Sequence, residues 1–185
     1  RIFIGQKSSY FGLSVKLHRT SQGARLLVGS PKANTTFEAN VVEPGGLFFC
    51  ELRNPLTANG SCNPFPLDRN GNSNGGSNPT TYKDKKDDQW MGVTLDAIQG
   101  TNGRVLTCGH RWINVQYSNH HLINGACYVM DSEMRENSIK RLLPLINANM
   151  QFPNENRQSL YGFAYGQAGI SAALSKSNPQ VLAIG

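Results

Sequence analysis

The segment YFGLSVKL, residues 10–17, decides the fold because the chain repeats it twice, as WMGVTLDA at 90–97 and QAGISAAL at 167–174. A glycine stands at the third position of each copy, and these glycines recur 80 and 77 residues apart. Self-similarity at such a period is typical of repeat architectures. Each copy is short and apolar and is bounded by turn residues, which predicts a β-strand.

A second apolar segment follows each copy of the first. These segments are RLLVGSP at 25–31, RVLTCGH at 104–110 and QVLAIG at 180–185. A third segment completes the first two units, GGLFFCEL at 45–52 and GACYVMDS at 125–132. Three or four antiparallel strands per unit favour blades of a β-propeller, in which Gly12, Gly92 and Gly169 would let the innermost strands crowd the axis. The alternative is that each glycine marks a bulge in an ordinary sandwich.

The composition supports an all-β fold. Of 185 residues, 19 are glycine and only 16% are charged, against about 25% for an average soluble domain. The net charge of +6 comes from scattered lysines and arginines, and the densest cluster, KDKKDD at 83–88, alternates in sign and is interpreted as a solvated loop. Nothing indicates nucleic-acid binding. No apolar run approaches the roughly 18 residues of a membrane span, and we expect the chain to be a fragment of a longer protein.

The cysteines indicate an oxidising, secreted context, because their number is even and no CxxC occurs. They are Cys50, Cys62, Cys108 and Cys127. The pairing of each cysteine with its neighbour in sequence closes the shortest loops, each contributing about 3 kcal/mol. A zinc site remains an alternative, although its spacings match no known pattern. Its ligands would come from Cys108, His110, His120, His121 and Cys127.

Two sequons, at Asn34 and Asn59, predict N-glycosylation. Residues 54–88 are interpreted as a loop-like insertion, and 131–149 could begin a helix that Pro144 would end. Residues 68–72 (DRNGN) resemble half of a calcium loop but lack its glycine and its closing acid. The common motifs of nucleophilic, metal-dependent and nucleotide-binding enzymes are absent from the sequence, so we expect no enzyme.

The F-G-x-S/T first strand followed by LLVG-S/A-P resembles the FG-GAP repeat of integrin alpha subunits. SYFGLSVKLHR, RLLVGSPKANTT, EPGGLFFCEL, DDQWMGVTLD and VLTCGHRW resemble the first two blades in the right order, and QAGISAAL with QVLAIG resembles the opening of the third. TCGHRW, KRLLP and QAGIS are most similar to the alpha-4 and alpha-9 type. LLVGSPKANTT is as similar to the RGD-binding type, so the subgroup stays open.

This resemblance implies the N-terminal part of a seven-bladed β-propeller, about two and a half blades. Residues 1–9 would form a strand completing the last blade, 10–89 blade one, 90–166 blade two with a connection, and 167–185 the start of blade three. The implied disulfides are Cys50 with Cys62 and Cys108 with Cys127. Leu145 and Gly166 stand where vertebrate relatives carry a further bridge, so the connection 131–165 is expected to be looser here.

The implied function is that of a cell-surface receptor for adhesion and signal transduction, anchored in the cell membrane by a missing C-terminal span. It would bind an extracellular-matrix or cell-surface protein together with an integrin beta subunit, and no cofactor is expected in this segment because the calcium sites belong to later blades. A secreted hydrolase with an FG-GAP accessory domain is the alternative.

Ligand would contact loops of the second and third blades, here about 111–125 and 149–165. The candidate contacts are the aromatic residues Trp112, Tyr117, Phe152 and Tyr161. Trp112 could instead pack beneath its own loop. Tyr161 lies near the position where RGD-reading subunits present an aspartate, and it cannot form that ion pair with a ligand arginine.

Overall fold

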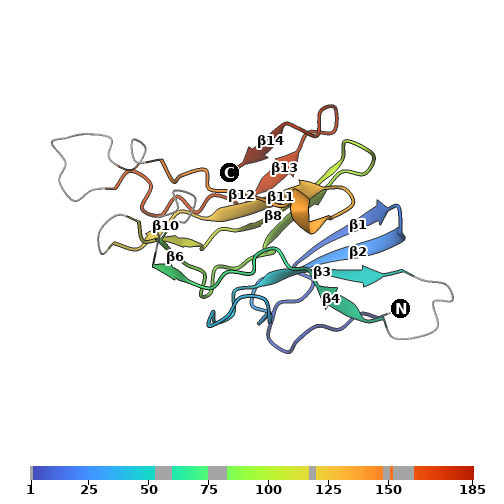
Figure 1. The fold of residues 1–185 in the computed structure, drawn as a ribbon, viewed down its shortest axis with the longest axis horizontal. Helices are drawn as coiled ribbons and strands as arrows, with labels where there is room; N and C mark the ends of the chain where they lie inside the picture. The colour runs from blue at the N-terminus through green and yellow to red at the C-terminus, as the bar shows by residue number, and fades with distance from the viewer. Residues whose placement is uncertain (1, 53–59, 75–82, 117–119, 148–150, 152–160) are drawn as a thin grey trace.

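The computed structural model describes residues 2–52, 60–74, 83–116, 120–147, 151 and 161–185. Within these residues the chain forms separate antiparallel sheets (Figure 1). The prediction of an all-β fold is confirmed. Short apolar segments bounded by glycine, proline and asparagine form the main strands. β8 and β11, in the second unit, are buried on both faces.

The first sheet follows the first repeat unit in chain order. Its strands are β1 (Ser14–Thr20), β2 (Gly23–Ser30), β3 (Gly46–Glu51) and β4 (Cys62–Pro64). The register pairs Ser14 with Gly29 and Thr20 with Gly23 across a tight turn. Gly23 has φ +124°, a backbone conformation that favours glycine at this turn.

The second unit forms an equivalent sheet. Its strands are β7 (Thr94–Ala97), β8 (Arg104–Gly109), β11 (Ala126–Asp131) and β12 (Lys140–Leu142). The helix predicted over 131–149 is wrong: the described segment holds only the 3₁₀ turn η1 (Glu136–Ser138) before β12. The Asp131 carboxylate accepts hydrogen bonds from the backbone N–H and Nε of Arg135, and the chain then turns back to pair with β11. This local bond and the sheet edge override the helical signal.

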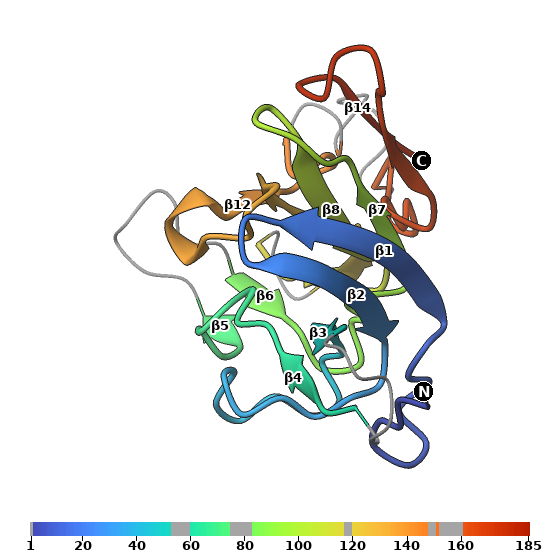
Figure 2. The same cartoon turned by 90° about the vertical axis from the view of Figure 1, so that its right-hand side faces the viewer.

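The third unit contributes the pair β13 (Ala172–Leu174) and β14 (Leu182–Ile184). The three first strands belong to different sheets, yet β7 lies against β1 on one side and against β13 on the other. Figure 2 shows the three hairpins following one another in this order. The repeated segments are therefore successive sheets, as blades require, and not neighbours in one continuous sheet.

A fourth, small sheet was not predicted. It comprises β10 (Leu122–Ile123), β9 (Ile113–Asn114), β6 (Lys83–Lys85) and β5 (Ser73–Asn74), in that order. It brings the insertion between the first two units against the loop inside the second. The hairpin turns of the blades point away from this sheet (Figure 1). The interpretation of 83–88 as a solvated loop is wrong for Asp84 and Lys86, which are buried and paired with opposite charges.

The three repeat glycines lie in turns just before the first strands, not within them. Gly12, Gly92 and Gly169 have φ values of +93°, +91° and +98°. Each is the third residue of a turn closed by a backbone bond from the following residue, a position that requires positive φ in a type II turn. The N–H groups of Gly12 and Gly92 also donate to the second strands of their own sheets, at Gly29 and Cys108, and that of Gly169 donates to Gly185, directly after β14. The glycine therefore fixes how each first strand begins.

Two apolar clusters fill the seams between units. The first joins the sheets of units one and two and includes Leu27, Leu47, Met91, Ala97, Val105, Tyr128 and Met130. The second joins units two and three and includes Leu106, Cys108, Cys127, Val129 and Leu174. The sheet of unit two buries one face in the first seam and the other face in the second. Its strands β8 and β11 are therefore apolar on both faces.

Both disulfides pair as the family resemblance implies. Cys50 bonds Cys62 across β3 and β4, and Cys108 bonds Cys127 across β8 and β11. At the N-terminus, Phe3 forms a parallel bridge with Gly60 beside β4. That strand 1–9 completes a last blade stays a prediction. No helix in the described parts of the chain is long and apolar enough to cross a membrane.

Candidate recognition surface

The two loops predicted to contact ligand are joined by backbone hydrogen bonds. Ile123 N–H donates to Ala164 O (2.7 Å), and Gln167 N–H donates to Ile123 O (3.0 Å). Ala168 N–H donates to the carbonyl oxygen of Asn124 (2.9 Å). Segments about 40 residues apart in sequence therefore form one surface beside the start of the third unit.

Buried amide side chains beneath this surface form hydrogen bonds to its two loops. Asn124 Nδ2 donates to Phe163 O (2.7 Å), while Asn124 Oδ1 accepts hydrogen bonds from Asn114 Nδ2 (3.0 Å) and Gln151 Nε2 (3.2 Å). Gln151 Nε2 also donates to Leu145 O (2.7 Å). Asn114, Asn124 and Gln151 are fully buried. Since buried amides are costly unless bonded, this network fixes the loop backbone.

Aromatic side chains project from the joined loops. The ring of Tyr161 lies 4.8 Å from the ring of His120, so the two loops also meet through their side chains. Phe163 and Tyr165 follow at alternate positions, and Tyr165 is 77% exposed. Exposed aromatic rings on a constrained backbone are typical of protein interfaces, because they offer contact area at low entropic cost.

Trp112 does not contribute to this exposed surface. Only 1% of it is exposed, and its Nε1 donates to Asp84 Oδ2 (3.1 Å). The alternative that it packs beneath its own loop holds, because the indole is buried with its N–H satisfied. Tyr117, Phe152 and the sequon residue Asn59 lie outside the described residues. Asn34 is exposed, and its Oδ1 accepts a hydrogen bond from Glu43 N–H (2.8 Å).

Sequence reasoning missed a second aromatic cluster, Tyr10–Trp90–His110–Arg111. The ring of Trp90 lies 5.8 Å from Tyr10 and 5.7 Å from His110, and the Arg111 guanidinium lies 5.3 Å from its centroid. The Asp88 carboxylate accepts from Trp90 Nε1 (2.8 Å) and pairs with Arg111 (2.9 Å). The available signal was an aromatic residue two positions before the repeat glycine in units one and two.

The aromatic cluster has an unusual backbone and a neutral imidazole. Tyr10 and Trp90 have φ values of +54° and +61°, which bulky residues adopt only when neighbours hold them there. Burial lowers the pKa of His110, and the nearby Arg111 charge lowers it further, so the imidazole is uncharged at neutral pH. The cluster therefore presents aromatic faces with one peripheral guanidinium.

A buried ionic network is hydrogen-bonded to the loop 111–125. Asp68 Oδ2 accepts hydrogen bonds from Lys86 Nζ (2.8 Å) and Tyr128 Oη (2.7 Å), and Arg141 bonds Asp84 (2.9 Å). Although burial opposes ionisation, Lys86 and Tyr128 hold the pKa of Asp68 below its usual range. Because Asp84 also binds Trp112, the network connects β12 to the loop 111–125.

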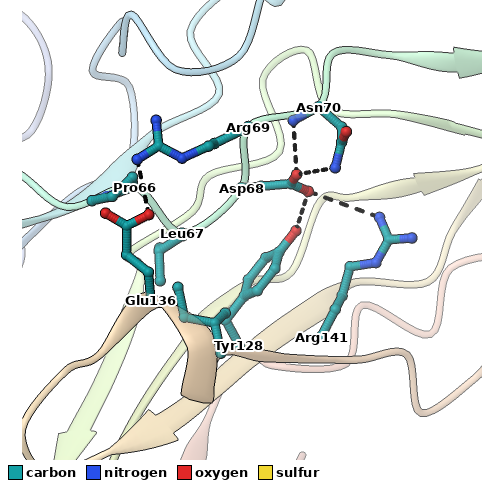
Figure 3. A pocket seen from close by; sticks show the side chains of 9 residues that line it. Pro66, Leu67, Asp68, Arg69, Asn70, Tyr128, Glu136 and Arg141 are labelled. Atoms are coloured by element: carbon teal, nitrogen blue, oxygen red, sulfur yellow. Dashed lines mark hydrogen bonds and ion pairs between the residues drawn. The ribbon is translucent and has the colours of Figure 1, made fainter.

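A cavity of about 330 Å³ lies beside this network (Figure 3). Asp68, Tyr128 and Arg141 form one wall, and the Arg69–Glu136 ion pair (2.9 Å) lies on another. These polar groups bond one another rather than pointing unpaired into the space. The cavity is therefore polar and suited to ordered water.

The metal alternatives have no structural support among the described residues. Cys108 and Cys127 are joined to each other, so their sulfurs cannot supply zinc-binding thiolates. The Asp68 carboxylate is paired with the Lys86 ammonium (2.8 Å) and accepts a hydrogen bond from Tyr128 Oη. Within the described ranges no three His, Cys, Asp or Glu side chains gather as a metal site would require.

The structure describes the connection 131–165, which is expected to be looser here, over 131–147, 151 and 161–165. Leu145 and Gly166 do lie together, since a Cβ on Gly166 would be 2.2 Å from Leu145 Cδ1. Leu145 and Gly166 therefore meet through the Leu145 side chain. Residues 148–150 and 152–160 lie outside the described residues, so the expectation stays a prediction.

Comparison with known proteins gives the family. No protein-family profile matches the chain. Integrin alpha-4 of Xenopus laevis is 35% identical over 175 residues, which is 92% of this chain and 16% of that protein. Integrin alpha-PS3 of Drosophila melanogaster is 29% identical over 183 residues, 95% of this chain and 16% of that protein. Human integrin alpha-6 is 34% identical over 138 residues, 71% of this chain and 11% of that protein.

The chain thus spans about a sixth of the length of the first two relatives. The matches to the first two relatives cover more than nine tenths of this chain. The ordered FG-GAP-like strands, the two short-range disulfides and this identity agree with one another. The chain belongs to the integrin alpha subunit family.

Proposed function

We propose that this chain forms part of the ligand-binding head of an adhesion-receptor alpha subunit, and that this receptor is not an enzyme. The whole protein would be a single-pass cell-membrane protein with this segment on the extracellular side. Its domain would be the first two blades and the start of the third, with boundaries 1–9, 10–89, 90–166 and 167–185. The names of the relatives, all integrin alpha subunits, support this proposal.

One observation carries the ligand site: loops 111–125 and 161–168 are joined into a surface with exposed aromatic rings. The sequence of these two ranges contains no aspartate or glutamate, but does contain Arg111, His120 and His121. Glu155, in the predicted loop 149–165, lies outside the described residues. The described part of the surface offers no carboxylate to a ligand arginine. It favours protein ligands that present apolar, aromatic or acidic side chains to the alpha subunit.

The Tyr10–Trp90–His110–Arg111 cluster is our proposed contact with the beta subunit. Tyr10 is exposed, and the cluster combines aromatic faces with a backbone held in a sparsely populated conformation. Strain of this kind persists where surrounding structure maintains it and often marks a functional surface. Aromatic anchors of this type dominate the energetics of protein interfaces.

The test uses the full-length subunit expressed with its beta partner. Tyr161→Ala should reduce cell adhesion while the amount of surface heterodimer stays unchanged. Trp90→Ala should reduce surface heterodimer itself, measured by co-precipitation and flow cytometry. Val181→Ala is the control, because Val181 is exposed and its backbone bonds Ser175 and Asn178 in unit three, away from both surfaces. Normal adhesion on RGD, LDV-type and laminin substrates with Tyr161→Ala would remove Tyr161 from the ligand site.

The alternative function, an accessory domain of a secreted hydrolase, is distinguished by the complete transcript. An encoded catalytic domain and no membrane span would overturn the receptor proposal. A single span with a short cytoplasmic tail would support it.

N-glycosylation is proposed at Asn34 and Asn59. Asn34 is exposed, as attachment of a glycan requires. Protein secreted from animal cells should lose mass on treatment with a peptide N-glycosidase, and Asn34→Gln should abolish one such step. An unchanged mass in the wild type would exclude both sites.

A further inference from the structure

The Asp88 carboxylate bonds two members of the aromatic cluster at once. Asp88 Oδ1 accepts a hydrogen bond from Trp90 Nε1 (2.8 Å), and Asp88 Oδ2 pairs with the Arg111 guanidinium (2.9 Å). The Arg111 guanidinium in turn lies 5.3 Å from the centroid of the Trp90 ring. The N–H groups of an indole and a guanidinium are donors only, so fixing both in one hydrogen-bonded unit needs a shared acceptor. Asp88 supplies that acceptor and sets how the ring and the cation lie relative to each other.

Contacts with unit one hold Asp88 in place. Its backbone N–H donates to Val42 O (2.9 Å), and Lys32 Nζ lies 3.7 Å from Asp88 Oδ1. Lys32 also pairs with Glu43 (2.7 Å), and this bond raises the pKa of Lys32, with the Asp88 charge adding to the rise, so the ammonium stays charged. Asp88 has φ +51°, in the left-handed region. Its carboxylate therefore projects from a backbone that contacts with unit one maintain.

The same contacts reach the Tyr10 ring. The backbone N–H of Lys32 donates to the carbonyl oxygen of Ser9 (3.0 Å), directly before Tyr10. The rings of Tyr10 and Trp90 lie 5.8 Å apart across the first seam. Aromatic pairs can adopt several ring arrangements, so the one observed depends on the groups that hold each ring. Ser9, Lys32 and Asp88 provide that support.

The neighbouring aspartate has a different set of contacts. The Asp87 carboxylate accepts hydrogen bonds from Val42 N–H (2.8 Å) and from Asn72 Nδ2 (2.6 Å). Both bonds anchor loop segments, and neither involves a member of the aromatic cluster. The side chains of Asp88 and Arg111 are 38% and 40% exposed, and an ion pair this exposed adds little stability. The Asp88 carboxylate therefore contributes mainly orientation, whereas that of Asp87 contributes to loop structure.

We propose that Asp88 is a positioning residue for the beta-subunit contact and acts through the Trp90 indole and the Arg111 guanidinium. This inference rests on the contact proposed above for the Tyr10–Trp90–His110–Arg111 cluster. Without the Asp88 carboxylate, the Trp90 ring and the Arg111 side chain regain rotamers that must be excluded again on binding. Assembly of the heterodimer therefore weakens, although every side chain of the cluster remains.

The test uses the full-length subunit expressed with its beta partner in excess, and it measures the fraction of the total alpha subunit that co-precipitates with the beta subunit. Asp88→Ala should lower this fraction about threefold, since two side chains must be ordered on binding. Asp88→Asn keeps an acceptor for Trp90 Nε1 and should lower the fraction less. Asp87→Ala, the matched control, should leave it unchanged. An equal fall with Asp87→Ala would mean that loop anchoring sets assembly, and would overturn the proposal.

A second background separates positioning from folding. Trp90→Phe with Arg111→Leu keeps an aromatic ring but removes both donors that Asp88 binds. Adding Asp88→Ala to this double variant should lower the fraction little further, because the carboxylate has no donor left to orient. A merely structural role, or misfolding caused by Asp88→Ala, would lower the fraction as much in this background as in the wild type, and would contradict the positioning role.

The proposed contact and the positioning role fail on different results. Unchanged assembly with Trp90→Ala would remove the cluster from the beta-subunit contact, and the positioning role with it. Reduced assembly with Trp90→Ala but normal assembly with Asp88→Ala would overturn the positioning role alone.

Discussion

The seam between units one and two and the seam between units two and three begin from the same motif but are filled differently. In both, a hydroxyl two residues after a turn glycine bonds the next turn glycine. In the first seam, Gly92 packs closely against the backbone of Gly29 and Gly46, and a buried ionic network lies in the same region. In the second, Gly169 rests on the Cys108–Cys127 disulfide.

This difference teaches that the repeat fixes where two units meet, but not what stabilises the contact. Gly29 and Cys108 are equivalent, since each accepts a hydrogen bond from the turn glycine of its own unit. The disulfide of unit one lies instead between β3 and β4, away from that position. A bridge in one unit is therefore part of a seam, while the bridge in the other stabilises a single sheet.

The largest expected loss of stability comes from removing a disulfide, and the loss should differ between the two disulfides. Cys108→Ala with Cys127→Ala should lower the free energy of unfolding by about 4 kcal/mol, because loop entropy and buried packing are both lost. Cys50→Ala with Cys62→Ala should cost about 3 kcal/mol, mainly through loop entropy. Urea unfolding of the two double variants measures the difference. Equal losses would show that the position of a bridge relative to the seam does not matter.

Replacing a repeat glycine by alanine tests how closely the units pack at the seam. Gly92→Ala should destabilise the chain by about 3 kcal/mol, since its Cβ would lie 2.5 Å from Gly46 O as well as at positive φ. Gly12→Ala should cost only about 1 kcal/mol, because φ is similar but nothing lies within 4 Å of the new Cβ. Thermal unfolding compares the two. Equal destabilisation by the two substitutions would mean that the positive φ alone, and not the close contact in the seam, sets the loss of stability.

Glu38 is buried and lines a small pocket with Asp68, Met91 and Tyr128, so its ionisation makes the first seam sensitive to pH. Burial raises the pKa of Glu38 to about 7, with Asp68 adding to the rise and Lys86 opposing it. Between the unfolded pKa of about 4.5 and the folded value, the folded chain keeps a proton that the unfolded chain releases. Stability from this group is thus present below about pH 4.5 and is lost as pH rises through 7.

Glu38→Gln should therefore stabilise the chain by about 2 kcal/mol at pH 8 and have little effect at pH 4.5. The amide resembles the protonated carboxyl and keeps an acceptor for the Thr35 hydroxyl. The measurement is the difference in unfolding free energy between wild type and variant across this pH range. A difference that does not change with pH would place the ionisation of Glu38 outside the seam energetics.

The smallest loss of stability is expected from removing the hydroxyl–glycine hydrogen bond that both seams share. Ser14→Ala and Thr94→Val should each cost about 1 kcal/mol, since each removes one hydrogen bond to a glycine carbonyl. A double variant with Gly92→Ala should show coupling for Ser14→Ala but not for Thr94→Val, because only Ser14 bonds Gly92. Additive losses in both cases would argue that the hydroxyls do not act through the turn glycines.

Sequence reasoning located the candidate site only at the level of loops. It predicted through the family resemblance that 111–125 and 149–165 form the ligand-binding loops, and the described residues of these loops do contact each other. It could not decide whether Trp112 is exposed, because that depends on Asp84, which lies 28 residues earlier and accepts the indole N–H. It missed the Tyr10–Trp90 pair, since contact across an 80-residue separation is not encoded locally.

The sequence by itself determined the main strands of each unit and the repeat period, because alternation and apolar content are local requirements. Only the structure placed the repeat glycines in turns before the first strands. The tertiary structure decided the small β5–β6–β9–β10 sheet, the burial of Asp84 and Lys86, and the replacement of a predicted helix by β12. These features depend on partners distant in sequence. A charge can be buried only where an opposite charge meets it, and a short strand forms only where an edge is available.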